Sequence, residues 1–296
     1  MSKTDTVEAS NHTLQLHDGR MLGYAEYGHV EGNPLFYFHG HPGARVEAGL
    51  LAKSAAQAGL RLIGVDRPGM GLSSFQAGRR LLDWPDDVAA LAQHLHIDHF
   101  AVVGFSGGGP YALACAYKIP DRLTACGVVA GMGPPEYSPA GMMASSRLVF
   151  FLARRLPWFL TPLMWAMGRS FQQEEQARKS LVRSAPHLIE PDRACVLDPD
   201  AGGLMAASMV EAFRQGARGP AYEGTMYGRS WDFRVEDIAF PALSLWHGER
   251  DRNVPVAMGR AVADKLAHCQ ATYYANEGHM SLVVNHAAEV VTILSS

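Results

Sequence analysis

Short apolar runs alternate with amphipathic segments along most of the chain. Strand-like runs lie at 35–38, 61–65, 100–103, 124–130, 242–246 and 272–275. Apolar residues at helical spacing occupy 44–58, 83–95, 107–118, about 256–266 and the end of the chain from about 282. Two further short runs flank the turn His17-Asp18-Gly19, which predicts a hairpin within 13–27. This order predicts an α/β domain with a mostly parallel twisted sheet and helices on both faces.

The alternation stops between residues 134 and 235. Aromatic residues, methionines and arginines recur there at helical spacing, without a clear strand pattern. We therefore expect a core domain of residues 1–133 and 236–296 and a helical cap insertion of residues 134–235. Its apolar side chains are expected to pack the cap onto the core or to line a pocket beneath it. They are Phe150, Phe151, Trp158, Phe159, Leu163, Met164, Trp165 and Met167.

Length and charge narrow the classes of protein. A chain of 296 residues suits one large domain with an insertion, and with a net charge of −3 we expect no basic field that would attract nucleic acid or an anionic membrane surface. Arg154, Arg155 and two prolines interrupt the apolar stretch 148–168, so no stable membrane insertion is expected. The polar start lacks a signal-peptide core, and the four cysteines lack C-x-x-C spacing, so we expect reduced thiols and a cytoplasmic protein.

Residues 94–109, HLHIDHFAVVGFSGGG, contain two catalytic signatures side by side. The first, HLHIDH, resembles the zinc-binding loop of metallo-β-lactamase-like hydrolases. However, His94 and His96 fall in the last turn of a predicted helix, where side chains two residues apart point about 200° apart. Both rings therefore cannot ligate one ion, and we expect no metal site. Glycine-rich phosphate-binding motifs in a strand-to-helix context are also missing, so no cofactor is implied.

The second signature is G-x-S-x-G around Ser106, directly after an apolar strand and directly before a helix. A strand-to-helix turn this tight predicts strained backbone angles at the serine. Gly104 and Gly108 are needed because side chains there would collide with neighbouring elements. The free N–H groups of the following helix would face a developing negative charge. Ser106 is therefore a candidate nucleophile.

A serine nucleophile needs a base, and the base needs an acid that orients it. The turn after the strand at 242–246 contains Asp251, and the turn after the strand at 272–275 contains His279. In a parallel sheet these turns meet at the carboxyl ends of the strands. The chain order Ser106, Asp251, His279 is the one given for α/β-hydrolases. Glu136, after the strand that precedes the insertion, is an alternative acid that we consider weaker.

Five motifs resemble the α/β-hydrolase superfamily, in its serine esterase and proline iminopeptidase-like branch, over residues 13–294. They are FHGHPG (38–43), DRPGMGLS (66–73), GFSGGG (104–109), HGERDRNVP (247–255) and EGHMSL (277–282). The resemblance implies the α/β-hydrolase fold and an oxyanion hole made by the N–H groups of His41 and Gly107, since Pro42 cannot donate. It also implies substrate contacts from the neighbourhood of these motifs and from the cap: His39, Gly40, Met70, Phe105, Trp158 and Met280.

The expected function is a serine hydrolase that cleaves small to medium, fairly apolar carboxylic esters through an acyl-enzyme intermediate, with a small-molecule ester or amide as substrate. One alternative is a proline iminopeptidase-like aminopeptidase, whose cap would need carboxylates for the substrate amine. Candidates are Glu174, Glu175, Glu190 and Glu211. Two departures from that family weaken this alternative. The chain has HGHPG where the family commonly has HGGPG, and its turn around Ser106 lacks the tryptophan found there in that family. Another is a slow-turnover ligand-binding or signalling protein on the same fold. The oligomeric state stays open.

Overall fold

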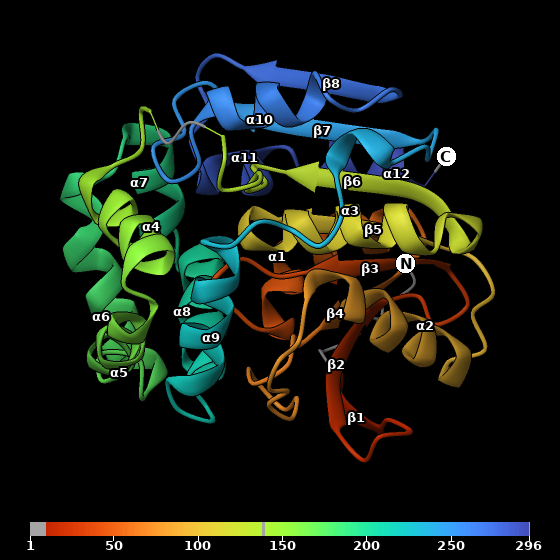
Figure 1. The fold of residues 1–296 in the computed structure, drawn as a ribbon, viewed down its shortest axis with the longest axis horizontal. Helices are drawn as coiled ribbons and strands as arrows, with labels where there is room; N and C mark the ends of the chain where they lie inside the picture. Colours follow the sequence, from red (N-terminus) through yellow and green to blue (C-terminus); the bar gives the residue numbers. More distant parts are fainter. Residues whose placement is uncertain (1–9, 138–139, 296) are drawn as a thin grey trace, which may run out of the picture.

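A computed structural model describes residues 10–137 and 140–295 of the chain, and its centre is an eight-stranded sheet (Figure 1). The strand order is β1-β2-β4-β3-β5-β6-β7-β8, and only the pairings of β2 are antiparallel. The expected mostly parallel sheet, with a hairpin at its start, is confirmed. Its strands are β1 (Ser10–Gln15), β2 (Met21–Gly28), β3 (Asn33–Phe38), β4 (Leu60–Val65), β5 (Phe100–Phe105), β6 (Leu123–Val129), β7 (Leu243–Gly248) and β8 (Cys269–Tyr274).

Helices cover both faces of this sheet, because successive strand residues point to opposite sides. Phe36 and Phe38 of β3 share a hydrophobic cluster with α2, α3 and α10, whereas Leu35 and Tyr37 share one with α1, α11 and α12. The helices outside the insertion are η1 (Arg45–Ala48), α1 (Gly49–Gln57), η2 (Leu81–Asp83), α2 (Trp84–His94), η3 (Ser106–Gly108), α3 (Gly109–Lys118), η4 (Pro120–Arg122), η7 (Val235–Asp237), α10 (Val256–Ala263), α11 (Met280–Asn285) and α12 (Ala287–Leu294).

One local expectation was wrong. His96 does not lie in the last turn of α2, which ends at His94; it follows the helix with φ 57°. Among the described residues, no three His, Cys, Asp or Glu side chains converge as metal ligands would.

The segment between β6 and β7 is helical and gathers beside the carboxyl ends of the parallel strands (Figure 1). We call its helices the cap helices, and the boundaries between core and cap remain a prediction. None of the helices formed by residues 10–137 and 140–295 is both long and apolar enough to cross a bilayer. The cap helices are α4 (Ala144–Arg155), η5 (Pro157–Phe159), α5 (Leu160–Gly168), α6 (Glu174–Ser184), η6 (Ala185–His187), α7 (Glu190–Leu197), α8 (Pro199–Ala212) and α9 (Arg218–Tyr227).

Candidate active site

Ser106 occupies the sharp turn between β5 and α3, with φ 53° in the left-handed region. The two flanking glycines make this turn possible. A Cβ on Gly104 would lie 2.2 Å from the carbonyl oxygen of Gly108, and a Cβ on Gly108 would lie 2.0 Å from the carbonyl oxygen of Phe38. Both approaches are closer than any side chain allows. The turn therefore holds the Ser106 hydroxyl at the carboxyl end of the sheet, as the motif predicts.

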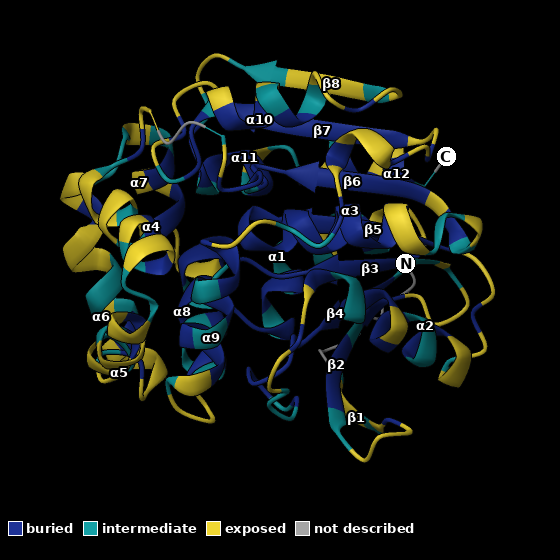
Figure 2. Ribbon diagram, in the orientation of Figure 1, coloured by how far each residue is buried: buried dark blue, intermediate teal, exposed yellow. Residues whose placement is uncertain are grey.

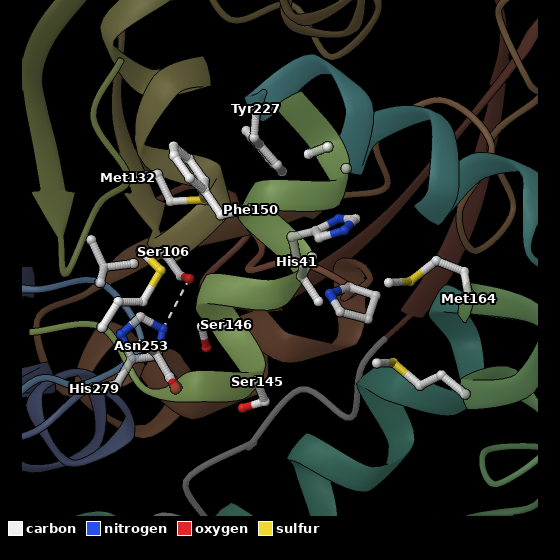
Figure 3. Close-up of a pocket in the computed structure, with 17 residues that line it drawn as sticks. His41, Ser106, Met132, Ser145, Ser146, Phe150, Met164, Tyr227, Asn253 and His279 are labelled. Carbon is white, nitrogen blue, oxygen red and sulfur yellow. Dashed lines mark hydrogen bonds between the residues drawn. The ribbon is translucent and has the colours of Figure 1, made fainter. Parts of the chain in front are cut away.

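The three residues expected to form a triad meet at this edge, and Figure 3 shows two of them, Ser106 and His279. The Nε2 atom of His279 lies 2.9 Å from the Oγ atom of Ser106, across a separation of 173 residues in sequence. The Nδ1 atom of His279 lies 2.7 Å from the Oδ2 atom of Asp251. Since a carboxylate only accepts, Nδ1 carries the proton and Nε2 is left to accept the serine hydroxyl. All three side chains are buried.

The surroundings of His279 set its proton affinity. Burial lowers the pKa of the imidazole, but the charge of Asp251 and the hydrogen bond to it outweigh this effect, so the pKa is raised above its ordinary value. Asp251 is itself fixed, because its Oδ1 atom accepts the N–H groups of Asn253 at 2.8 Å and Val254 at 2.9 Å. The ring of Phe105 lies beneath the imidazole, with 5.0 Å between ring centroids.

A second histidine, His247, lies close to the carboxylate of Asp251 but hydrogen-bonds to a backbone carbonyl. Its Nε2 atom is 3.5 Å from Oδ2 of Asp251 and 2.8 Å from the carbonyl oxygen of Val254. Burial lowers the pKa of His247, so the ring is neutral and donates to that carbonyl. The proximity to Asp251 is therefore not an ion pair, and His279 is the imidazole that Asp251 orients.

Asp192 of α7 holds the backbone of the turn that contains His279. Its buried carboxylate accepts the N–H of His279 at 3.0 Å and those of Met280 and Ser281 at 2.9 Å each. A Cβ on Gly278 would collide with this carboxylate at 2.4 Å, so glycine allows the close approach. A cap residue thus fixes a catalytic candidate of the core. Asp192 could not be predicted from the sequence, because no local pattern marks it.

We expect Asp192→Asn to lower kcat by up to about 10²-fold with a small effect on KM, because an amide nitrogen facing backbone N–H groups would displace His279 by a fraction of an ångström. The pH profile of kcat/KM would also shift, since a negative charge near the imidazole is lost. Steady-state kinetics against pH, with the exposed Asp200→Asn as control, test this. An unchanged profile and kcat in Asp192→Asn would contradict it.

The loop after β3 is pinned from two sides. The N–H of Gly40 donates to Oε1 of Glu47 at 2.6 Å, and its carbonyl accepts from Arg67 at 2.9 Å. The guanidinium of Arg67 also donates to the carbonyl of His39, while the backbone N–H of Arg67 donates to Nε2 of the His39 ring at 3.2 Å. Burial holds the pKa of His39 well below its ordinary value, so this ring is neutral. His39 and Gly40 therefore support the loop.

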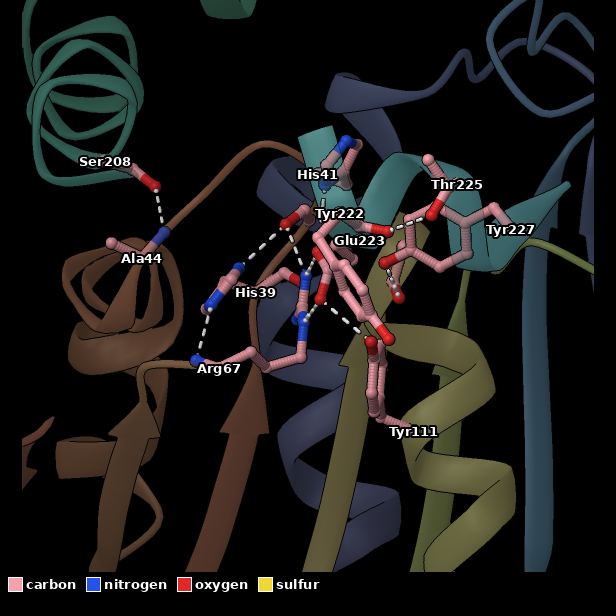
Figure 4. A network of polar contacts seen from close by, with 12 residues as sticks. His39, His41, Ala44, Arg67, Tyr111, Ser208, Tyr222, Glu223, Thr225 and Tyr227 are labelled. Atoms are coloured by element: carbon pink, nitrogen blue, oxygen red, sulfur yellow. Dashed lines mark hydrogen bonds and ion pairs between the residues drawn. The ribbon is translucent and has the colours of Figure 1, made fainter. Parts of the chain in front are cut away.

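The carboxylate of Glu223 on α9 is the centre of a buried network (Figure 4). Its oxygens accept from Arg67 at 2.7 and 2.8 Å, from Arg79 at 3.1 Å, from the hydroxyl of Tyr111 at 2.9 Å and from Nδ1 of His41 at 2.9 Å. Burial raises the pKa of Glu223, but Arg67 and the other donors outweigh it and hold the pKa well below its ordinary value. An ionised glutamate of the cap thus anchors the loop of the core that carries His41.

The triad opens into a cavity of about 280 Å³ between core and cap (Figure 3). Most of its wall is apolar, and the inward faces of α4 and α5 supply much of it. The Nε2 atom of His41 is buried beside this cavity and has no hydrogen-bond partner among the described residues. The lining residues are His41, Pro42, Ser106, Met132, Met142, Ser145, Ser146, Val149, Phe150, Ala153, Met164, Met167, Gly224, Tyr227, Asn253, Val254 and His279.

The other predicted site residues lie outside this wall. Trp158 is 65 % exposed on η5, and Met70 is fully buried away from the cavity. Met280, the first residue of α11, packs against α7 and α8, and its N–H donates to Asp192. His39, Gly40 and Phe105 have the contacts described above, so none of these six residues lines the cavity beside Ser106. The lining residues of α4 could have been found from the sequence, because Ser146, Val149, Phe150 and Ala153 recur at the spacing of one helix face.

The two residues expected to form the oxyanion hole lie side by side, and the alternative acid lies away from the imidazole. Gly107 lies against His41, because a Cβ on Gly107 would lie 2.7 Å from the Cβ of His41. The hydroxyl of Tyr227 donates to the carbonyl of Gly107 at 2.8 Å, which fixes the orientation of this peptide. Glu136 is exposed, whereas Asp251 contacts the imidazole. The geometry therefore joins His41 and Gly107 beside Ser106.

Known proteins share this architecture. Residues 33–285 match the family model described as alpha/beta hydrolase fold. The chain is 26% identical over 274 residues to a proline iminopeptidase of Clostridium botulinum, covering 88% of each protein. An alpha/beta hydrolase fold protein from Nakamurella multipartita superposes with a TM-score of 0.70 at 21% identity, over 97% of this chain and 99% of that one. An esterase from Exiguobacterium antarcticum gives 0.69 at 16% identity, over 97% and 100%.

Proposed function

Since the chain belongs to the alpha/beta-hydrolase fold family, we propose that it is a serine hydrolase that cleaves small to medium, apolar carboxylic esters through an acyl-enzyme intermediate. The observation that carries the proposal is the continuous hydrogen-bonded chain from Asp251 through His279 to Ser106 at the wall of an apolar cavity. Acyl transfer to a serine requires a hydroxyl, a base that takes its proton and an acid that orients the base.

The proposed reaction follows from the placement of protons. The Oγ atom of Ser106 attacks the carbonyl carbon of the ester while its proton passes to Nε2 of His279. The charge of Asp251 stabilises the imidazolium, and the proton then moves to the departing alcohol oxygen. A water molecule, deprotonated by the same imidazole, attacks the acyl carbon. The bond to the Oγ atom of Ser106 then breaks, this oxygen takes back the proton from His279, and the acid is released. Proton transfer from the free serine uses the 2.9 Å contact between Ser106 and His279, and the 2.7 Å contact with Asp251 holds the imidazole in every step.

The negative oxygen of the tetrahedral intermediate would be bound by the backbone N–H groups of His41 and Gly107. Their close packing supports this assignment, as does the anchoring of the loop by Arg67 and Glu47. Loss of one such donor typically lowers kcat by about 10²–10³-fold. A rigid loop matters because donors that are already in place need no reorganisation during the reaction.

The apolar wall of the cavity favours substrates with an apolar acyl or alcohol group. Methionine side chains in its wall adapt to irregular shapes. An aminopeptidase would need a carboxylate for the substrate ammonium, yet the described lining residues include none. Of the glutamates considered for that role, Glu174, Glu175 and Glu190 are exposed, and Glu211 pairs with Arg45 at 2.7 Å. The proline iminopeptidase relative keeps this activity as the second candidate.

A substrate panel tests the proposal. We expect turnover of short p-nitrophenyl esters and little turnover of proline anilides, with fluorophosphonate labelling of the active serine. Efficient hydrolysis of proline anilides would instead support the aminopeptidase. Labelling without appreciable turnover of any ester would support a slow ligand-binding protein on the same fold.

The raised pKa of His279 predicts the acidic limb of the pH profile. The imidazole must be neutral to accept the serine proton, so kcat/KM is lost as the pH falls through its pKa. We expect this limb above the ordinary histidine value of 6.5. Asp251→Asn should move the limb to lower pH in addition to lowering the rate, because the charge that favours the imidazolium is removed. A limb at or below the ordinary value in the wild type would contradict this prediction.

A further inference from the structure

The outward side of the first cap helices exposes an unusual set of large apolar side chains. Ten large hydrophobic residues are exposed among those described, and five of them lie between 148 and 165. Their exposed fractions run from 51% to 65%. Figure 2 shows exposed residues, in yellow, along α4 and α5. With the neighbouring arginines they form what we call the cap patch: Arg147, Leu148, Phe151, Arg154, Arg155, Trp158, Phe159, Trp165 and Arg169.

Helix α4 has two different faces. Val149, Phe150 and Ala153 face the cavity of the candidate active site. Leu148 and Phe151 are more than half exposed on the other face, with arginines at positions 147, 154 and 155 beside them. A surface groove runs along this outward face and is lined by both the apolar and the basic side chains. A helix that only packed the cap onto the core would carry polar residues there.

The charge of this segment is opposite to that of the whole protein. Residues 140–173 contain four arginines and no aspartate, glutamate or lysine, whereas the complete chain has a net charge of −3. Arg154 donates to the carbonyl of Pro135 at 2.9 Å, and the guanidinium of Arg169 lies over the ring of Trp165 at 5.2 Å. Neither interaction neutralises charge, so the exposed apolar surface is also cationic.

We propose that the cap patch docks the protein on the surface of an anionic phospholipid bilayer. Tryptophan suits the headgroup boundary, because its apolar ring is buried there while the indole N–H stays hydrated, and the neighbouring phenylalanines bury further apolar surface. The arginines that line the outward groove of α4 together with Leu148 and Phe151 are attracted to anionic lipid headgroups. A second copy of the chain fits this surface less well, because a two-fold contact would bring two cationic segments together. The docking is peripheral, and no helix needs to span the bilayer.

This location has a consequence for the proposed function, although the docking itself does not depend on it. The same helices present one face to the bilayer and the other face to the cavity that holds Ser106. An apolar ester dissolved in the membrane would therefore lie one helix layer from the candidate nucleophile. The surface thereby favours lipophilic esters that partition into membranes over fully water-soluble ones.

Vesicle sedimentation of the full chain tests the proposal. We expect the wild type to pellet with vesicles of phosphatidylcholine and phosphatidylglycerol, and to be released by salt. Arg147→Glu/Arg155→Glu should weaken this binding by at least about tenfold. Trp158→Ser/Trp165→Ser should weaken it as well, because the rings no longer enter the headgroup boundary. Lys53→Glu/Lys265→Glu, which makes the same charge change on exposed core positions, is the matched control.

Four outcomes would overturn the proposal: no pelleting of the wild type, equal binding to pure phosphatidylcholine, equal weakening in the matched control, or a dimer in sedimentation velocity that the tryptophan variant abolishes. The last result would identify a second copy as the occupant. Circular dichroism checks that the variants are folded. Hydrolysis of a short soluble ester without vesicles is expected to be unchanged in the patch variants. If neither the wild type nor any variant hydrolyses the ester, while the wild type still binds vesicles, the proposed function is refuted and the docking proposal is not.

Discussion

Ser106→Ala is expected to lower kcat for ester hydrolysis by about 10⁴–10⁶-fold while the protein stays folded. The hydroxyl is the only atom of this side chain that bonds to His279, at 2.9 Å, so its removal takes away the nucleophile and little packing. Activity above the uncatalysed rate should remain, because the oxyanion donors and the cavity are unchanged. Steady-state kinetics with a p-nitrophenyl ester and fluorophosphonate labelling both report this loss.

The controls for this variant separate chemistry from folding. Ser184→Ala, on the exposed surface of α6, removes a hydroxyl away from the cavity and should retain full activity and labelling. His279→Ala should lose nearly as much activity as Ser106→Ala, and the double variant should lose no more than the more damaged single variant, because the two groups act as a unit. Ser106→Ala activity within about tenfold of the wild type would refute the nucleophile assignment.

Glu223→Gln is expected to lower the free energy of unfolding by about 3–5 kcal/mol. The substitution keeps the shape of the side chain but removes the negative charge that Arg67 and Arg79 share in a fully buried site. One amide group would also face donors rather than accept from them, which leaves hydrogen-bond donors unsatisfied. The loop with His41 would lose an anchor, so kcat should fall together with stability.

Urea unfolding measures the effect of Glu223→Gln on stability. Glu236→Gln, which removes one partner of the exposed ion pair with Arg234, is the matched control and should leave the midpoint unchanged within error. An unchanged midpoint in Glu223→Gln would show that the buried arginines do not depend on this carboxylate. A shifted midpoint with unchanged kcat would separate the structural role of the network from any role in holding the loop.

Much of the candidate site could be predicted from the sequence, because the patterns that mark it lie within short segments of the chain. The alternation of apolar runs and helical segments encodes the sheet, since each strand must bury its face against a helix. Gly104, Ser106 and Gly108 encode the nucleophile turn through close backbone approaches that only glycine allows. Asp251 and His279 could be paired with Ser106 because parallel strands bring their following turns to one edge. The sequence alone therefore determined the fold class and the candidate triad.

The tertiary structure decided what depends on contacts between distant segments. Asp192 and Glu223 look like ordinary helix-surface acids in sequence, and only the docking of the cap onto the core buries them against backbone N–H groups and arginines. The six expected substrate contacts lie outside the cavity wall, since motif proximity does not fix where a side chain points. Net charge sums over all residues, so it concealed the cationic segment 140–173. Such pairings carry no local pattern, because their energy comes from desolvation and proximity that exist only after folding.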